Sequence, residues 1–429
     1  MKIKLSIIPL MTLLLSSCVI QNSNASGDLN SKNSTIGSKI PKTIKLTYSG
    51  SASNKEFNNS LFEKFKKERK NAGDKNTYII DYYECDPNLV TSKIENWSSG
   101  PDIYEFTTGS FKELYKLGAL SKLTDANATF INENYSDYGK KLATYNGEYY
   151  AYPYAGDSTY YIHYNKSFFN ENDVKSIETM LDLALTHGKK IGFPLDDSFY
   201  GGAIMFTFGA NCNVSFDETG SVISTTADFN TEEGIKAAKA IQKIGNHPAW
   251  KNAGLYPYVD AAIDNDTVAY ISGHWYSSFY KNKFEEKYAC AAMPTITIDG
   301  DTKHLSAFLD GLAFGINPKS LDSDNDRLVA AYELAKFLSN EESQLARFED
   351  QNLAPCNIDA ITNNKISSNP NAQAIISQYE FAITQNNIPT NFWTSVSTLL
   401  DSIVHDEINS DQGFVEALNS FNDSIIKGN

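Results

Sequence analysis

Residues 42–83 read KTIKLTYSGSASNKEFNNSLFEKFKKERKNAGDKNTYIIDYY. The opening stretch, Lys42–Tyr48, alternates polar and apolar residues, which is typical of a half-buried strand. The apolar residues of Phe57–Lys70 recur at helical spacing, and Thr77–Tyr83 has the composition of a second strand. Because two parallel strands need a crossover between them, this order predicts an α/β fold built on a parallel sheet.

The alternation of strands and helices continues along the chain. A third strand is predicted over Ile103–Phe106, after the turn Gly100-Pro101-Asp102, and others over Val268–Ile271 and Ala313–Ile316. Segments with helical spacing separate these strands. These segments are Phe111–Leu117, Ile177–Thr186, Thr231–Ile244, Leu328–Leu338, Ala372–Thr384 and Phe392–Ile408. The sequence shows no internal repeat of about 20–50 residues, which excludes a repeat architecture.

Composition narrows the class of protein. The chain has 429 residues, of which 41% are hydrophobic and 21% charged, so it can bury real cores, and its length indicates two or three domains. Its 37 Lys and Arg against 52 Asp and Glu give a net charge of −15. This acidic balance excludes the basic surface that nucleic acid or anionic lipid requires. Aromatic residues reach 12%, so we expect some rings to line a binding surface.

The N-terminus has the features of an export signal. Lys2 and Lys4 precede an apolar run, Leu5–Leu15, that is too short to span a membrane as a mature helix. The run ends in Leu15-Ser16-Ser17-Cys18, which resembles a bacterial lipobox, where small residues admit the peptidase and the thiol accepts diacylglycerol. The alternative is an ordinary secretory signal that happens to contain Cys18.

The lipobox predicts how the mature chain is held. We expect a signal peptide over residues 1–17 and lipidation of Cys18, followed by a flexible tether, rich in Asn, Ser and Gly, over residues 18–40. The protein would then be anchored by lipid to the cell membrane, on its extracytoplasmic face. The later cysteines have no C-x-x-C spacing, and the sequence leaves both their pairing and their redox state open. They are Cys85, Cys212, Cys290 and Cys356.

Five groups of segments, in order along the chain, carry a family resemblance. They are GPDIY at 100–104 with LYKLGAL at 114–120, NGEYYAYPYA at 146–155 with YNK at 164–166, AYISGHW at 269–275, GLAFGIN at 311–317 with AYELAKFL at 331–338, and NIPTNFW at 387–393. Together they resemble the sugar-binding lipoproteins of ABC importers, the maltose-binding-protein type of extracellular solute-binding protein.

This resemblance implies a fold and a function. The fold is a two-lobed α/β periplasmic-binding-protein-like fold of type II, with a ligand cleft between lobes that a multi-strand hinge joins. The N-lobe would comprise residues 41–155 plus 314–358, and the C-lobe residues 156–308 plus 362–429. The implied function is to bind an (oligo)saccharide by lobe closure and to deliver it to the permease subunits of an ABC importer. The resemblance implies no catalytic residue, cofactor or metal.

Sugars bind through two kinds of surface, C–H faces that stack on aromatic rings and hydroxyls that need strong acceptors. The resemblance implies ring stacking for Trp275 and Trp393, and it places Phe106 where the family often has a stacking Trp. It also places Asp157 as an acid near the hinge, with Tyr154 beside it. For the rings the alternative is core packing, since large aromatic side chains are mostly buried.

A second loop supplies further candidates. The resemblance implies that Asp197 provides an acid and Tyr200 an aromatic ring, with Phe199 behind them. A solvated surface position is the alternative for both Asp157 and Asp197. His274 is a further candidate for ligand contact, although a lone histidine is more often structural.

The chain departs from the maltodextrin binders in the predicted N-lobe. They carry Asp-Arg where this chain has Gly109-Ser110, and an Asp-Lys pair where it has Ser49–Ser53. The charged side chains that bind sugar in the maltodextrin binders are therefore largely missing from this lobe, which argues against maltose itself as the ligand.

Sequence features of other protein classes are incomplete or absent. Residues 322–333 nearly spell a calcium loop, but Arg327 replaces the glycine needed for its sharp turn, and acids are common at a helix start. No H-E-x-x-H, P-loop or G-x-S-x-G motif is present, and nothing fixes Asp157 and Asp197 as a glycosidase pair, so an enzyme is not predicted. A receptor for polyamine or another small solute, and a lipoprotein adhesin, remain alternatives.

Overall fold

A computed structural model describes residues 41–217, 220–254, 256–321 and 324–427. It contains the predicted opening as β1 (Thr43–Gly50), α1 (Lys55–Asn71) and β2 (Thr77–Glu84). β1 and β2 pair in parallel along their whole lengths, and α1 buries apolar residues such as Leu61 and Phe62. The prediction of a parallel α/β opening is therefore confirmed.

The N-terminal features fall outside the described residues. The predicted signal peptide (1–17), the tether (18–40) and Cys18 all belong to that part of the chain. Within the described part, none of the helices combines the length and the apolar character needed to cross a membrane.

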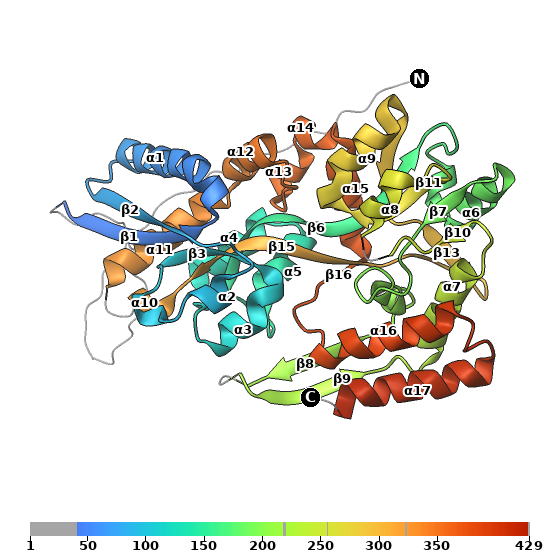
Figure 1. Cartoon of the computed structure of the whole chain (residues 1–429). Helices are drawn as coiled ribbons and strands as arrows, with labels where there is room; N and C mark the ends of the chain where they lie inside the picture. Colours follow the sequence, from blue (N-terminus) through green and yellow to red (C-terminus); the bar gives the residue numbers. More distant parts are fainter. Residues whose placement is uncertain (1–40, 218–219, 255, 322–323, 428–429) are drawn as a thin grey trace, which may run out of the picture. The chain divides into compact units, whose positions relative to one another are not determined.

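One sheet runs through the structure (Figure 1). Its further strands are β3 (Ile103–Thr107), β6 (Ala151–Asn165), β7 (Lys190–Gly192), β10 (Trp250–Lys251), β11 (Thr267–Gly273), β12 (Tyr288–Ala291), β15 (Ala307–Ile316) and β16 (Ala382–Ile383). The order is β10-β7-β11-β6-β15-β3-β1-β2, with β12 added to β6 and β16 to β15. The sheet is mixed. β6 runs antiparallel to its neighbours β11 and β15, and β15 also runs antiparallel to β3. The expected parallel pairing thus holds towards the two ends and between β15 and β16.

β6 is a strand of 15 residues that the sequence pattern does not predict. Its sequence, AYPYAGDSTYYIHYN, contains Pro153 and Gly156, which are unfavourable in strands. Polar and apolar residues do not alternate because nearly every residue of the strand is buried. Its first half pairs with β15 and its second half with β11 and β12, so β6 joins the two ends of the sheet.

Helices cover the sheet, and small hairpins lie beside it (Figure 1). The helices are α2 (Val90–Lys93), α3 (Phe111–Lys116), α4 (Asp125–Asn134), α5 (Asp137–Ala143), α6 (Ile177–Thr186), α7 (Glu232–Gly245), α8 (Pro257–Ile263), α9 (Ser277–Phe284), α10 (Pro318–Leu321), α11 (Asn325–Leu338), α12 (Glu341–Gln351), α13 (Ile358–Thr362), α14 (Asn364–Ser367), α15 (Pro370–Gln378), α16 (Thr390–Val404) and α17 (Asp411–Lys427). The hairpins are β4 (Thr144–Tyr145) with β5 (Glu148–Tyr149), β8 (Cys212–Phe216) with β9 (Val222–Ala227), and β13 (Thr295–Ile298) with β14 (Asp301–His304).

The predicted helices are present, with one error. The segment Ala372–Thr384 is predicted as a single helix, but α15 ends at Gln378. A 3₁₀ turn follows, and Ala382–Ile383 forms β16, which pairs with β15. The apolar residues after Gln378 thus continue the helical spacing, but they form a strand of the sheet instead of a further helical turn.

The buried apolar side chains form two large clusters. The larger draws on residues 160–308 and 388–425. The second draws on residues 44–155 and 314–356. β6 and β15 contribute to both, so these two strands connect the cores.

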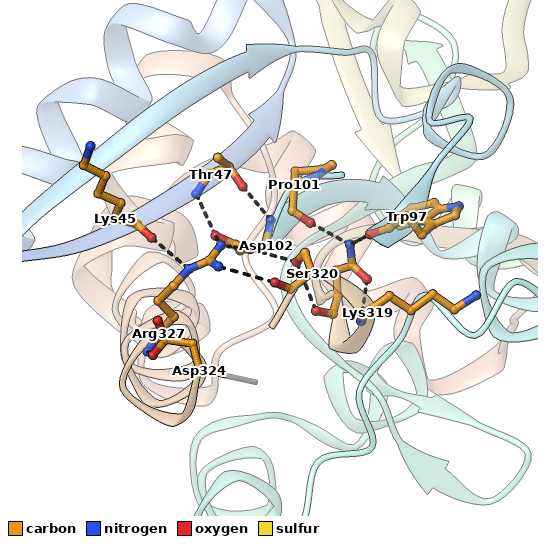
Figure 2. Close-up of polar contacts among 10 residues, drawn as sticks. Lys45, Thr47, Trp97, Pro101, Asp102, Lys319, Ser320, Asp324 and Arg327 are labelled. Carbon is orange, nitrogen blue, oxygen red and sulfur yellow. Dashed lines mark hydrogen bonds and ion pairs between the residues drawn. The ribbon is translucent and has the colours of Figure 1, made fainter. Parts of the chain in front are cut away.

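Figure 2 shows a polar network that anchors the Gly100-Pro101-Asp102 turn. Asp102 has no exposed surface, and both of its carboxylate oxygens accept from Arg327 Nη2 at 2.7 Å. Ser320 Oγ donates to the same carboxylate at 2.7 Å, and the Thr47 backbone N–H at 2.9 Å. Asn317 donates to two backbone carbonyls beside the turn. The turn thereby ties β1 and β3 to α10 and α11.

The segment that nearly spells a calcium loop is used differently. Asp322 and Ser323 lie outside the described residues, whereas Asp324 caps α11 by accepting from the Arg327 backbone N–H at 3.0 Å. Asp326 pairs with Lys42. The described part of the chain contains no group of three or more His, Cys, Asp or Glu placed to hold a metal ion. All four cysteines of that part are free thiols.

Candidate ligand-binding site

One face of the β6–β15 pair carries the candidate site. Alternation along β15 puts Phe308 and Asp310 on the same face, and alternation along β6 does the same for Ser158 and Tyr160. Asp310 lies opposite Ser158 in the ladder, and the Phe308 backbone N–H donates to the Tyr160 hydroxyl at 3.4 Å. We call these four residues the site face. Side chains from loops and helices far apart in the sequence lie over it.

A row of aromatic rings crosses the site face. Trp275 and Phe199 have ring centroids 6.4 Å apart, Phe199 lies 6.0 Å from Phe308, and Phe308 lies 4.9 Å from Trp393. We call these four rings the aromatic row. The Trp275 side chain is 46% exposed, whereas Phe199 and Trp393 are half-buried and Phe308 is buried. The row therefore offers accessible ring surface at the Trp275 end.

Local geometry explains why Trp275 stands there. It lies in a 3₁₀ turn (His274–Tyr276) directly after β11. A Cβ on Gly273 would come within 2.2 Å of the Trp275 ring. Only glycine therefore lets the indole fold against the end of the strand.

The Asp197 loop presents Phe199. Asp197 Oδ1 accepts from the backbone N–H groups of Phe199 and Tyr200, both at 2.9 Å, and so fixes the turn. Burial raises the pKa of the Asp197 carboxyl, although these two hydrogen bonds oppose the shift. Tyr200 is almost fully buried, with its ring 4.9 Å from that of Tyr160. The Asp197 carboxylate thus stabilises the conformation of its own loop, and the buried Tyr200 ring packs against Phe199 from the core side.

Asp157 forms a second polar group beside the site face. It is 5% exposed, and its Oδ2 lies 3.4 Å from Nε2 of His274. Nδ1 of His274 and Oγ of Ser272 are buried without a hydrogen-bond partner among the described residues. Buried polar atoms that lack partners call for an explanation, but such atoms also occur within the cores, for example in Tyr145 and Arg347.

Asp310 is a functional candidate that the sequence reasoning missed. Its carboxylate accepts from Gln385 Nε2 at 2.8 Å and from Thr108 Oγ1 at 3.3 Å. Burial raises the pKa of this carboxyl to about 6, although hydrogen bonds from the Thr108 hydroxyl and the Gln385 backbone oppose the shift. Its side chain nevertheless keeps some exposed surface. The available signal was an acid inside the apolar run AFLDGLAFGI.

Comparison with known proteins identifies the family. The family model described as "Bacterial extracellular solute-binding protein" matches residues 60–374, well over half of the chain. The chain belongs to this family. No curated protein matches this solute-binding protein.

Solved structures show the same fold as this solute-binding protein. The maltodextrin-binding protein MalE1 from L. casei BL23, without ligand, is 19% identical with a TM-score of 0.75, over 90% of this chain and 99% of that one. A cyclo/maltodextrin-binding protein complexed with maltotetraose is 18% identical with a TM-score of 0.71, over 91% and 98%. The periplasmic maltose-binding protein MalE from Listeria monocytogenes, in complex with maltose, is 18% identical with a TM-score of 0.69, over 90% and 99%. The predicted maltose-binding-protein-like α/β fold is therefore confirmed.

Two predicted site residues of this solute-binding protein lie in the core instead. Phe106 has no exposed surface and packs between Tyr104 and Phe111, at 5.8 and 5.1 Å. Tyr154 is 1% exposed and stacks on Phe314 at 4.5 Å. Because neither ring can reach a ligand from these positions, we leave both out of the proposed site.

Proposed function

We propose that this solute-binding protein is a carbohydrate receptor that binds an oligosaccharide on the site face and delivers it to the permease of an ABC importer. The observation that carries the proposal is the aromatic row, with accessible surface at Trp275, beside the carboxylates of Asp157 and Asp310. Rings suit the C–H faces of sugars, and carboxylates suit their hydroxyls. Related folds solved with maltose and maltotetraose support the same ligand class.

We also propose that the protein works by lobe closure. The lobes would be residues 41–155 with 314–358 and residues 156–308 with 362–429. The two separate cores, joined through β6 and β15, support this division. A ligand that contacts both lobes stabilises the closed form, which the permease then recognises. Neither step requires a cofactor or covalent chemistry.

A thermal-shift screen tests the ligand class. Because a ligand that binds only the folded state stabilises it, an oligosaccharide at about 100 times its Kd should raise the Tm by roughly 3 °C. The chain from residue 41 onward would be screened against maltose, maltotriose, maltotetraose, other disaccharides, spermidine, putrescine and phosphate. A shift with spermidine or putrescine alone would replace the sugar by a polyamine, which the acidic groups beside the rings also fit. No shift with any compound would favour an adhesin.

We propose that lipid on Cys18 anchors the receptor outside the cytoplasm. Cys18→Ser should move the protein from the membrane fraction to the soluble extracytoplasmic fraction, because the lipid has no thiol to join. Cell fractionation and immunoblotting measure this. Cys85→Ser is the matched control, since that half-buried thiol belongs to the folded part and should not affect anchoring. A Cys18→Ser protein that stays with membranes contradicts the lipobox.

A further inference from the structure

Asp310 occupies an unusual position on the site face. It lies where the pairing of β15 with β6 shifts register, between Asp310 and Leu312. Its two hydrogen-bond donors come from distant parts of the chain, Thr108 beyond the end of β3 and Gln385 ahead of α16. Thr108 Oγ1 also accepts from the Gly311 backbone N–H at 2.9 Å, which fixes the hydroxyl in place. The carboxylate is therefore held from two sides.

Gly109 leaves one side of the carboxylate open. A Cβ at this position would lie 3.0 Å from Asp310 Oδ2, closer than side-chain carbons normally approach. A side chain at 109 would thus force the carboxylate to shift by a few tenths of an ångström and would fill the space beside it. The glycine thus keeps a space beside a half-buried acid.

The surroundings of Asp310 do not neutralise its charge. Thr108 and Gln385 are neutral, and the described residues form no ion pair with Asp310. The titratable group that interacts with it electrostatically is Tyr138 of α5, which is itself neutral at ordinary pH. A carboxylate has about four acceptor sites, so two donors leave acceptor capacity unused. An enclosed acid without a cation is costly unless a partner completes its hydrogen bonds.

We propose that Asp310 is a ligand-binding residue of this receptor, whose carboxylate accepts hydrogen bonds from sugar hydroxyls in the space beside Gly109, with Thr108 and Gln385 as positioning residues. The inference deepens the proposed function and rests on it. Phe308, two residues earlier on the same face, is itself buried but packs against the half-buried rings of Phe199 and Trp393, so a sugar stacked on those rings would lie near the carboxylate.

Ligand contact should change the protonation of the Asp310 carboxyl, which can be measured. The pKa of the Asp310 carboxyl is about 6 without ligand, because burial disfavours the charged form. Hydroxyl groups that donate to the carboxylate favour the charged form and lower this pKa. Near pH 6 binding should therefore release up to about half a proton, and affinity should weaken as the pH falls below about 6.

Calorimetry of the full-length protein with maltotetraose tests the proposal. Titrations at pH 6 and pH 8, in buffers of different ionisation heat, give both the Kd and the protons released. Asp310→Asn should raise the Kd tenfold or more at pH 8, and it should remove the proton release at pH 6. Histidine also titrates in this range, so the difference between wild type and variant is the readout. Asp81→Asn, at an exposed position on β2, is the matched control.

A stability measurement separates ligand contact from a structural role. An asparagine can accept from Gln385 and donate to Thr108, so the fold keeps both contacts. Because the folded state raises the pKa of Asp310, the ionised acid costs stability above about pH 6, and Asp310→Asn should unfold at pH 8 at no lower temperature than wild type. Gly109→Ala should also weaken binding, whereas Gly245→Ala, whose Cβ would have nothing closer than 3.8 Å, should not.

The outcomes are distinguishable. If wild type binds maltotetraose and Asp310→Asn binds within twofold with the same proton release, the inference is wrong and the proposed function stands. A variant that loses stability and affinity together at both pH values also overturns it, because Asp310 is then structural. If wild type binds none of the sugars in the screen, the proposed function fails and this inference fails with it.

Discussion

Arg327→Ala should lower the free energy of unfolding by about 3–5 kcal/mol, because it leaves a buried carboxylate without its cation. Asp102 has no exposed surface, and Arg327 Nη2 donates to both of its oxygens at 2.7 Å. Ser320 and Thr47 would still donate to the carboxylate, but neither carries charge. The Arg327 side chain is 30% exposed, so water can enter the space, and we expect the lower end of the range.

Urea unfolding of the chain from residue 41 onward measures this loss. Lys42→Ala is the matched control, since Lys42 and Asp326 form an ion pair in which both side chains are about half exposed. Exposed pairs contribute about 0–1 kcal/mol, so this variant should stay close to wild type. Equal effects of the two variants would show that Asp102 is solvated despite its burial.

The Asp102 network also bears on the site. β3 starts at the anchored turn and leads directly to Thr108 and Gly109. Pairing of β3 with β15 then sets these residues against Asp310. We therefore interpret the GPD motif, which is a family marker in the sequence, as the fixed end of a strand whose other end leads to Asp310.

The parts of the fold that the sequence predicts are those governed by local pattern. The β1–α1–β2 opening is correct because one face of each element is buried and the other exposed, which produces the periodicity. β6 was missed because nearly all of its residues are buried, so the period that marks a strand disappears. The end of α15 was missed because pairing of Ala382–Ile383 with β15 overrides the helical spacing.

The residues of the candidate site likewise divide into those that local sequence signals predict and those that only tertiary contacts define. Trp275 could be named from the family resemblance, and a glycine before an aromatic residue at a strand end is a local signal that agrees with it. Asp310 could not, because its partners Thr108 and Gln385 are 202 and 75 residues away in the sequence. The family resemblance predicts Phe106 in the site, where the family often has a stacking Trp, yet packing against Phe111 makes it a core residue. Exposure of an aromatic ring depends on tertiary packing, which the pattern does not encode.

Trp275→Ala should weaken oligosaccharide binding by about thirtyfold, or roughly 2 kcal/mol, with little change in stability. The ring is 46% exposed, so its removal costs little packing, whereas a stacked sugar loses its largest contact. Trp393 makes a useful comparison, because it is half-buried against Phe308 and Phe392, at 4.9 and 5.4 Å. Trp393→Ala should weaken binding tenfold or more and also lower stability.

Two measurements on each variant separate these roles, calorimetry with maltotetraose for affinity and urea unfolding for stability. Leu185→Ala on α6 is the matched control, since that side chain is 47% exposed and lies on a helix that contributes no residue to the site face. If Trp275→Ala binds like Leu185→Ala, the exposed indole does not contact the sugar, and the aromatic row is only the surface of the core. If Trp393→Ala loses stability but binds normally, the row ends at Phe308, and the ligand lies towards Trp275 and Asp310.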